Sequence, residues 1–248
     1  MKRVTVAVFA GFLALTGLGF AAEEAADPAI QTLIVTGRDV ASHEWRLTTP
    51  ALRKILEESG KFDVVVCEDP LILESERALQ KYDLIVFNYF NFKAPTLSDP
   101  AKENLAEFIR GGKGFVTFHL SSASFSEWPE WRKICGRNWI MGTSGHGPYG
   151  EFEAEVVKEH PITKGVAKTF KTEDELYAKL QGDEDINILV SAYSDWSKKV
   201  EPLAFTVNYG KGRVYHHAFG HKVVSVANEP VAKLFAQGAE WAATGEVE

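Results

Sequence analysis

The chain has 248 residues, of which 45% are hydrophobic and 25% charged, with 20 glycines, 10 prolines and 2 cysteines. This composition is typical of a soluble globular protein and excludes collagen-like, disordered and disulfide-scaffold chains. With 27 basic against 34 acidic residues the formal charge is −7. The chain as a whole therefore lacks the positive charge that attracts nucleic acid, and we expect no nucleic-acid partner.

The first 21 residues have the pattern of a secretory signal peptide. Lys2 and Arg3 precede an uncharged stretch over residues 4–20, and small residues lead from it into an acidic segment. A basic start, an apolar run and a small-residue cleavage site are the three parts of such a signal. An uncleaved anchor is the alternative, but the run is slightly short for a membrane-spanning helix, which needs about 20 apolar residues.

Cleavage after Ala21 would remove two of the 27 basic residues and move the formal charge from −7 to −9. The later apolar runs are too short to span a membrane. We therefore expect a periplasmic or secreted protein with no membrane segment after cleavage. Residues 22–29 would form a short N-terminal segment, and residues 30–245 a single domain, because no linker, repeat or low-complexity tract interrupts them.

Four short and nearly continuous apolar runs predict buried strands in the first half of the chain. They cover residues 32–35, 62–67, 82–87 and 114–119. Runs of Val, Ile, Leu and Phe without polar alternation indicate strands that are covered on both faces, as in parallel sheets.

Two amphipathic segments between these strands predict helices. The first begins after Thr49, with Pro50 at the first helical position, and ends at Gly60; the second begins after Ser98 or Asp99 and ends at residue 111. The alternation of strands and helices predicts an α/β fold, with an open, doubly wound and mostly parallel sheet and helices on both faces.

The second half of the chain is less regular. Residues 152–157 alternate like a half-buried strand, and residues 186–193 resemble a central strand. Residues 202–207 and 214–219, joined by a turn that contains two glycines, predict a hairpin. Apolar residues at helical spacing over residues 231–241 predict a closing amphipathic helix.

Cys67 and Cys135 are the two cysteines. An oxidising compartment would permit a disulfide between them. Cys67 ends an apolar run, however, where a buried thiol is equally reasonable, so both states remain open. Their spacing matches no metal or thioredoxin-like motif.

Polar and aromatic groups gather where the predicted strands end. In an open α/β sheet, ligands bind outside the carboxyl ends of the strands. The segments that follow the first, third and fourth strands supply His43, Trp45, Arg46, Asn88, Tyr89 and His119. Each residue alone could be a hydrogen-bonded filler, but their convergence on one edge favours a binding or catalytic site.

The second half adds further candidates. His146 and Tyr149 lie in a glycine-flanked loop, which could instead be a solvated turn. Glu175 ends an acidic patch, and a solvated helix start is the simpler interpretation of Glu173 and Asp174. His221 follows a strand end at Gly220.

Two further groups of histidines are less informative. His216 and His217 are adjacent on a predicted strand, so at most one of them can face a site. His160 precedes a proline and is interpreted as a turn residue.

Four histidines and one carboxylate suggest two kinds of chemistry. Imidazole and carboxylate groups bind zinc or manganese, so a divalent metal is a candidate cofactor, with His119, His146 and His221 as candidate ligands. Proton transfer is the alternative, because histidine titrates near neutral pH. The motifs of serine hydrolases, P-loops and dinucleotide-binding folds do not occur in the sequence.

Six motifs stand in order along the chain. They are His43-x-Trp45-Arg46-x-Thr48-Thr49, Phe118-His119, Gly145-His146-Gly147-Pro148-Tyr149, His160-Pro161-Ile162-Thr163-x-Gly165, Asp174-Glu175-Leu176-Tyr177, and Tyr209-Gly210-x-Gly212-Arg213-Val214 with Phe219-Gly220-His221. Across residues 30–245 they resemble the ThuA-like family of trehalose-utilisation proteins. The resemblance implies a flavodoxin-like fold of the class I glutamine amidotransferase kind. It also implies action on disaccharides or their 3-keto derivatives, beside sugar dehydrogenases.

Two positions depart from the patterns that the resemblance implies. Amidotransferases with this fold carry a nucleophilic cysteine after a central strand, whereas His119 stands at the corresponding position here. We therefore do not expect cysteine-dependent glutamine hydrolysis. The family often has an aspartate after the last Gly-His pair, but Lys222 stands there in this chain, so an acidic role is not carried over.

The first functional hypothesis is an exported enzyme that acts on a disaccharide or 3-keto-sugar by histidine- or metal-assisted isomerisation, elimination or hydrolysis. Its catalytic residues would be His119, His146 and Glu175. Its substrate-binding residues would be His43, Trp45, Arg46, Asn88, Tyr89, Tyr149 and His221. A small sugar is the expected partner, with a sugar dehydrogenase in the same pathway as a second one.

The alternative is a non-catalytic carbohydrate-binding module. Aromatic side chains would stack on the sugar and amides would bind its hydroxyls; the candidates are Trp45, Tyr89, Tyr149, Trp196, Asn88 and Asn91. The histidines favour the enzyme, because a binding module has little use for four titratable groups at one edge.

Overall fold

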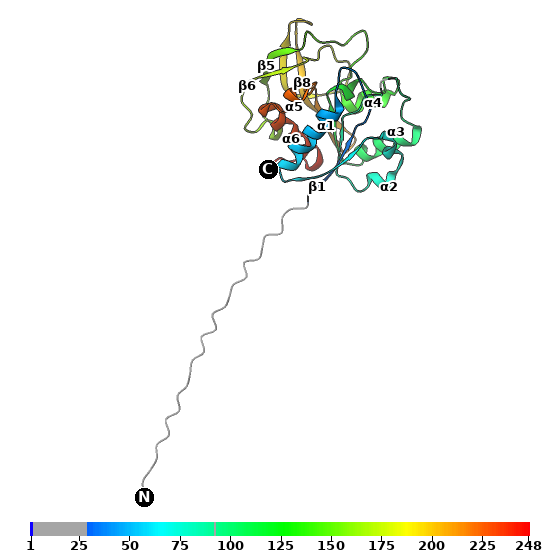
Figure 1. Ribbon diagram of the computed structural model, residues 1–248, viewed down its shortest axis with the longest axis vertical. Helices are drawn as coiled ribbons and strands as arrows, with labels where there is room; N and C mark the ends of the chain where they lie inside the picture. The colour runs from blue at the N-terminus through cyan, green and yellow to red at the C-terminus, as the bar shows by residue number, and fades with distance from the viewer. Residues whose placement is uncertain (2–28, 92) are drawn as a thin grey trace.

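The structure is a computed structural model that describes residues 1, 29–91 and 93–248. The predicted signal peptide and nearly all of the following short segment lie outside the described residues. Within the described part of the chain, the strands form one nine-stranded sheet in the order β2-β1-β3-β4-β9-β8-β7-β5-β6, with helices packed on both faces (Figure 1). The predicted α/β fold class is confirmed.

Five strands of this sheet run parallel to one another, and we call them the parallel half. They are β1 (Ile30–Val35), β2 (Phe62–Cys67), β3 (Leu84–Phe87), β4 (Gly114–Phe118) and β9 (Gly212–His217). Residues on alternate sides of β1 belong to two different cores, with Ile34 in one and Leu33 and Val35 in the other. Both faces are therefore buried, which explains the continuous apolar runs in the sequence.

The remaining four strands extend the sheet by antiparallel pairing, and we call them the antiparallel half. They are β5 (Gly150–Val156), β6 (Thr169–Asp174), β7 (Asn187–Ser194) and β8 (Lys199–Tyr209). Four successive antiparallel pairings separate β6 from β9, so β6 runs in the same direction as the parallel half. Its carboxyl end therefore lies at the same edge of the sheet as theirs.

The helices divide into two layers. On one face lie α1 (Trp45–Glu58), α5 (Val223–Val226) and α6 (Glu229–Thr244). On the other lie α2 (Glu76–Leu79), α3 (Asp99–Arg110) and α4 (Pro129–Cys135). Short 3-10 turns add η1 (Pro70–Glu74), η2 (His119–Ala123) and η3 (Pro161–Thr163). This layering is that of a doubly wound sheet (Figure 1).

The start of α1 differs from the prediction. The helix begins at Trp45 after Glu44, and Pro50 lies inside it instead of at its first position. Trp45 is buried, and Thr49 is held by a hydrogen bond between its hydroxyl and that of Thr36 at 3.0 Å. Tertiary packing thus fixes the first turn, at the cost of the one backbone hydrogen bond that Pro50 cannot donate.

The acidic patch before Glu175 is also different from the simpler interpretation. Glu173 and Asp174 end strand β6 and start no helix, and Asp174 is almost completely buried. Strand β6 escaped prediction because its residues alternate between exposed and buried and include only one apolar side chain, Phe170. Cys67 and Cys135, both within the described part of the chain, are free, so the disulfide left open above is not formed.

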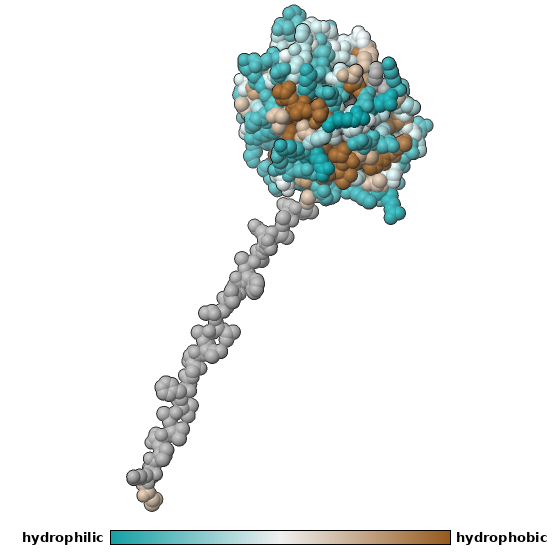
Figure 2. Space-filling model, in the orientation of Figure 1, coloured by the Kyte–Doolittle hydropathy of each residue, from teal (hydrophilic) through white to brown (hydrophobic). Residues whose placement is uncertain are grey.

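The viewed surface is largely hydrophilic and carries several separate hydrophobic patches (Figure 2). Scattered exposed apolar side chains, such as Leu47 on α1 and Val224 on α5, are normal on soluble proteins. Among the described residues, no helix is both long enough and apolar enough to span a membrane.

Candidate metal-binding site at the carboxyl edge of the sheet

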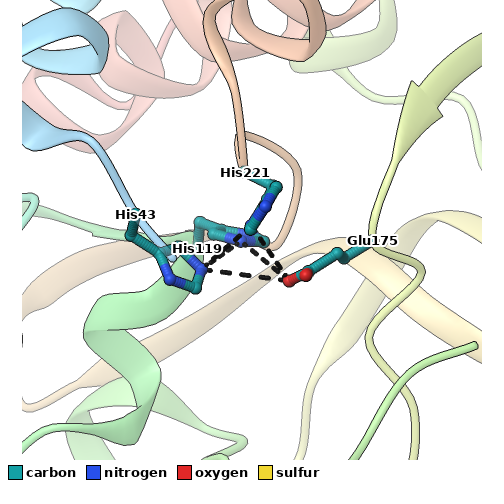
Figure 3. A group of neighbouring side chains, drawn as sticks. All are labelled: His43, His119, Glu175 and His221. Atoms are coloured by element: carbon teal, nitrogen blue, oxygen red, sulfur yellow. Dashed lines mark hydrogen bonds and ion pairs between the residues drawn. The ribbon is translucent and has the colours of Figure 1, made fainter. Parts of the chain in front are cut away.

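Three histidines meet at the carboxyl edge of the parallel half, each carried by a different strand connection. His43 lies in the loop after β1, where its N–H donates to the Val40 carbonyl. His119 directly follows β4, and His221 lies in the turn after β9. The His43 Nε2 atom is 3.2 Å from His119 Nε2 and 3.2 Å from His221 Nδ1. The ring nitrogens thus converge on one point (Figure 3).

The antiparallel half supplies the fourth member, Glu175, directly after β6. Its Oε2 atom is 3.1 Å from His221 Nδ1 and 3.9 Å from the Nε2 atoms of both His43 and His119. One donor atom from each of the four residues lies within 4.8 Å of the other three (Figure 3). We call these four residues the His3Glu cluster.

Burial keeps two of these imidazoles neutral. Desolvation lowers the pKa of His43 to about 4, and the charge of His221 adds to this effect. Desolvation and the neighbouring His43 hold the pKa of the fully buried His119 well below its usual value. The Nδ1 atom of His119 lies 2.6 Å from the Ala218 carbonyl oxygen, which can only accept, so Nδ1 carries the hydrogen. The lone pair of His119 Nε2 therefore points into the cluster.

Burial alone would raise the pKa of the Glu175 carboxyl. The hydrogen bond from His221 and the charges of His221, His146 and His43 outweigh burial, so the pKa lies below its usual value. Glu175 is therefore a carboxylate, and it faces three imidazole nitrogens. A cation is the species that would satisfy all four groups at once.

The spacing of the four donor atoms fits a transition metal. Zinc is bound by nitrogen and oxygen at about 2.0–2.2 Å, which in tetrahedral or octahedral geometry places neighbouring ligand atoms roughly 3.0–3.6 Å apart. Five of the six separations run from 3.1 to 3.9 Å, and all six lie within 4.8 Å. A cavity of about 20 Å³, lined by His43, His119 and His221 but not by Glu175, lies directly beside the cluster and has room for about one water-sized occupant. The residues present therefore fit a divalent ion such as zinc or manganese.

The backbone at His119 is strained. Its φ is +42°, in the left-handed region that residues with a Cβ atom rarely adopt. Such a conformation costs about 1–3 kcal/mol and is found most often at functional sites. Here it turns the chain sharply at the end of β4 and directs the ring into the cluster.

The thiol of Cys135, which is fully buried, accepts a hydrogen bond from Thr117 and takes no part in this site.

Asp174 ties the two halves of the sheet together behind the cluster. Its Oδ2 atom accepts a hydrogen bond from the Gly220 N–H at 2.7 Å, and its Oδ1 atom accepts from the N–H groups of His221 and Glu175 at 3.1 and 2.8 Å. Burial raises the pKa of Asp174 to about 6 despite these bonds. The turn needs glycine at position 220, because φ is +123° and a Cβ atom there would meet the Phe118 ring at 2.1 Å.

His146 lies beside the cluster instead of within it. Its Nε2 atom is 3.4 Å from Oε1 of Glu175, the carboxylate oxygen that faces away from the other histidines, and its Nδ1 atom is 2.6 Å from the Gly147 carbonyl. Backbone hydrogen bonds between Gly145 and Ala178, at 2.8 and 3.1 Å, hold this loop against the segment after β6. Of the candidate ligands His119, His146 and His221, the structure thus brings two together with His43 and Glu175 and places His146 beside them.

A second and larger cavity opens next to the cluster. Its volume is about 370 Å³, large enough for a sugar ring, and His43, His146 and Glu175 form one wall. Aromatic and apolar side chains complete its lining; these are Phe90, Trp139, Met141 and Tyr177. Sequence reasoning did not single out Trp139 or Tyr177 as site residues, although Tyr177 stands two positions after Glu175 in the same motif.

The remaining predicted substrate-binding residues lie around this edge. Trp45, Asn88 and Tyr89 line the small cavity beside His43 and His119. The Trp45 indole N–H donates to Asp39, and the Asn88 amide donates to the hydroxyls of two threonines, at positions 48 and 49. The indole N–H of Trp45 and the amide N–H groups of Asn88 are thus engaged within the protein.

Arg46 and Tyr149 lie further out. Arg46 is exposed, pairs with Asp39 and covers the Trp45 ring at 4.4 Å. The Tyr149 ring lies 5.4 Å from the His221 ring, while its hydroxyl donates to the Glu173 carbonyl at 3.3 Å. Neither residue lines the two cavities at the cluster.

Three other histidines are placed away from the site. His216 and His217 are both buried within β9, where their Nδ1 atoms lie 2.9 Å from the Cys135 carbonyl and 3.0 Å from the Tyr215 hydroxyl. His160 precedes η3 and its ring accepts a hydrogen bond from the Ile162 N–H, as its interpretation as a turn residue expects.

The fold and site together define an α/β protein with a glutamine amidotransferase-like topology and a histidine-carboxylate cluster in place of a cysteine nucleophile. The family model for ThuA, described as trehalose utilisation, matches residues 31–242. The chain belongs to the ThuA family, and the resemblance seen in its motifs is confirmed.

Solved structures agree with this assignment. A ThuA-like protein from Parabacteroides merdae is 29% identical, with 89% of this chain and 92% of that chain covered and a TM-score of 0.78. A ThuA-like protein from Bacteroides uniformis is 18% identical, with 92% and 98% covered and a TM-score of 0.71.

More distant structures share the fold alone. A GMP synthase protein from Thermoplasma acidophilum is 13% identical, with 86% of this chain and 96% of that chain covered and a TM-score of 0.51. This likeness supports the glutamine amidotransferase-like topology. No curated protein matches the sequence.

Proposed function

We propose that this ThuA-family protein is a divalent-metal-dependent enzyme that acts on a disaccharide or a 3-keto-sugar by proton transfer. The observation that carries the proposal is the His3Glu cluster, whose four donor atoms are spaced for one ion beside a cavity of about 370 Å³. The family's link to trehalose utilisation favours a carbohydrate substrate.

His43, His119, His221 and Glu175 would hold the ion. When bound, a divalent ion supplies a positive charge that stabilises negative charge on a carbonyl or hydroxyl oxygen of the substrate. The protein residues around it orient the ligands: the Ala218 carbonyl fixes the His119 ring, and Asp174 fixes the backbone of His221 and Glu175.

His146 is the group best placed to move a proton. It is half-buried, lines the larger cavity and lies outside the set of metal ligands. A keto group acidifies the hydrogen on the neighbouring carbon. His146 Nε2 takes that proton, the C–H electron pair forms a C=C bond, and the carbonyl π pair moves onto oxygen to give an enediolate. Return of the proton to the former carbonyl carbon, with transfer of the neighbouring hydroxyl proton to the enediolate oxygen, gives isomerisation. Re-formation of the carbonyl with loss of the glycosidic oxygen and its electron pair, protonated by His146 as it leaves, gives elimination.

The alternative is a carbohydrate-binding module without catalysis. The observation that favours it is the aromatic lining of the cavity, because Phe90 and Trp139 are partly exposed there and offer ring faces for stacking on a sugar. The buried cluster argues against it, since four converging metal-type ligands add nothing to sugar stacking.

We further propose, from the sequence of residues 1–21, that the protein is exported to the periplasm or beyond. A sugar dehydrogenase that oxidises a sugar hydroxyl to a ketone would supply the substrate. Fractionation of cells that express the full chain, with N-terminal sequencing of the product, tests the export proposal. Recovery of the intact N-terminus in the cytoplasm would contradict it.

The enzymatic proposal is tested by incubating the purified protein, with zinc or manganese content measured, with 3-keto-trehalose and 3-keto-glucosides under NMR observation. We expect metal-dependent conversion, and a fall in kcat of about 10² to 10⁴-fold in His146→Ala with metal content unchanged. His160→Asn is the matched control, because this histidine lies outside the site and asparagine can also cap a helix. Sugar binding without conversion, equal in both variants, would favour the binding module.

A further inference from the structure

Tyr177 has a hydroxyl that the cluster leaves unexplained. The side chain is only 1% exposed and lies on the segment after β6, two residues beyond Glu175. Its hydroxyl contacts His43 Nε2 at 3.4 Å, at the long end of the hydrogen-bond range. The same His43 nitrogen also lies within 3.2 to 3.9 Å of donor atoms of the other three members of the His3Glu cluster.

The position of this hydroxyl is fixed by the packing of the ring. The Tyr177 ring stacks on His119 with 4.2 Å between centroids and an interplanar angle of 26°, and it packs against Trp139 at 4.6 Å. Its neighbour Ala178 is bonded through both backbone groups to Gly145. A phenol ring packed against two aromatic side chains, next to a residue with a fixed backbone, cannot swing to another acceptor.

The hydroxyl lies at the cluster, and the Tyr177 residue also lines the larger cavity together with His43, His146 and Glu175. This inference rests on the proposed function: an ion in the His3Glu cluster would take up the lone pair of His43 Nε2. The phenol would then lose its acceptor, and its hydrogen would be free to reach an oxygen atom that enters from the cavity.

We propose that the Tyr177 hydroxyl is a catalytic hydrogen-bond donor, which binds the substrate oxygen that gains negative charge during proton transfer. The phenol keeps its proton throughout and shortens its hydrogen bond as charge develops on that oxygen. A fixed donor of this kind is most effective in a site from which water is excluded, where it needs no reorganisation during the reaction. Tyr177 would thus complement His146, which takes the proton from carbon.

Tyr177→Phe tests the proposal, because phenylalanine keeps the ring that packs on His119 and Trp139 and removes only the oxygen. We expect kcat on a 3-keto-glucoside to fall by about 10²-fold or more with little change in KM. Losses of this size are typical of enzymes that lose one hydrogen-bond donor to a developing oxyanion. Metal content should stay unchanged. Tyr215→Phe is the matched control, since it removes another buried phenol that bonds to a histidine, His217, outside the site.

A second readout does not depend on sugar turnover. The protein is loaded with Co²⁺ and titrated with azide, while visible absorption follows the anion at the open position of the metal. A hydrogen bond to a charged group contributes about 1.5–3 kcal/mol, so Tyr177→Phe should weaken azide binding by roughly tenfold or more.

Equal azide affinity in wild type and Tyr177→Phe, with equal kcat, overturns the role of Tyr177 alone. A wild type that binds Co²⁺ and azide but leaves every keto-sugar unchanged contradicts the proposed reaction, and the azide titration still decides whether Tyr177 is a donor. A wild type that binds no Co²⁺ overturns both proposals.

Discussion

The parallel and antiparallel halves of the sheet contribute to the site in different ways. The parallel half brings three histidines, His43, His119 and His221, to one edge through three separate strand connections. The antiparallel half brings the carboxylate of Glu175, the Tyr177 ring and the loop that carries His146. The first half supplies nitrogen donors, and the second supplies the negative charge; both contribute to the wall of the larger cavity.

The two halves meet at this edge because β6 runs in the same direction as the parallel strands. Its carboxyl end therefore lies at the edge where open α/β sheets usually bind ligands, although β6 itself pairs with an antiparallel strand. Asp174 joins the halves, since one carboxylate accepts N–H groups from the turn after β9 and from the end of β6. The comparison teaches that the full set of four donor atoms is assembled only where the two halves meet.

The largest expected effect comes from removing the one ligand of the antiparallel half. Glu175→Gln replaces a charged carboxylate by a neutral amide, so we expect affinity for zinc or manganese to fall by about 10²-fold or more. This is more than the loss expected when a residue that only hydrogen-bonds to a ligand is removed. Metal content after dialysis against a chelator measures it. Glu173→Gln, an exposed neighbour whose side chain is outside the cluster, should keep its metal. Equal metal retention in both variants would show that the parallel half suffices.

The next effect concerns stability and contrasts the two halves directly. Leu33 in β1 is fully buried between layers, and Leu33→Ala should lower the free energy of unfolding by about 2 to 5 kcal/mol. Val200 in β8 is 64% exposed, and Val200→Ala should change it by less than about 0.5 kcal/mol. Urea denaturation of each variant gives both values. Similar losses at the two sites would mean that the exposed side of the antiparallel half is covered in solution.

A smaller effect tests the joint between the halves. Asp174→Asn replaces one acceptor oxygen by an amide nitrogen, which cannot accept. The turn of His221 and the Glu175 backbone therefore lose some of the hydrogen bonds that hold them. We expect metal affinity to fall by about 10 to 100-fold, as for other groups that orient ligands. Competition with a fluorescent chelator measures the change, and Asp195→Asn on the exposed surface serves as control. An unchanged affinity would show that the halves are held in place without this carboxylate.

The smallest effect is a pH dependence at β9, where the two halves join. Burial lowers the pKa of His216 to about 4 and of His217 to about 3, from a usual value of 6.5. Because the unfolded chain takes up these protons first, the stability contributed by the neutral rings is complete above about pH 6.5 and is lost as the pH falls towards 4. The expected slope is up to about 1.4 kcal/mol per pH unit for each proton.

Urea denaturation of the metal-free protein between pH 7 and 4 measures this slope. His217→Gln should reduce it, since glutamine does not titrate and its carbonyl can still accept from Tyr215. Asp174 acts in the opposite direction: its pKa is raised to about 6, so its contribution is present below about 3.8 and is lost as the pH rises through 6. Because Asp174 is present in both proteins, its contribution cancels when the slope of His217→Gln is subtracted from that of the wild type. An identical slope in the two proteins would mean that His217 is not neutral in the fold.

Much of the parallel half could be predicted from the sequence. Continuous runs such as residues 84–87 are strands because both faces are buried, and the helices between them are amphipathic. The candidates His43, His119 and His221 followed from the same pattern, because parallel strands present their carboxyl ends at one edge. Glu175 was a candidate from the acidic patch in which it lies, although strand β6, which directly precedes it, was not predicted.

The start of α1, strand β6 and the state of Asp174 depended on contacts that are distant in sequence. Pro50 is a good helix-start signal, but buried side chains at Trp45 and Thr49 determine where α1 begins. Strand β6 forms because it pairs with β5, and its own residues have a weak strand signal. Asp174 looks like a solvated acid in the sequence, yet backbone N–H groups 46 and 47 positions away allow it to be buried.

By itself, the sequence determined the fold class, the family, the edge of the sheet at which polar side chains gather, and most of the residues that surround the candidate site. Local periodicity and motif order carry this information, since they depend on near neighbours in the chain. Only the tertiary structure decided which side chains converge: His43 and Glu175 are in the His3Glu cluster, and His146 is beside it. The spacing of the donor atoms depends on contacts between the end of β6 and the turn after β9, and these segments are distant in the sequence.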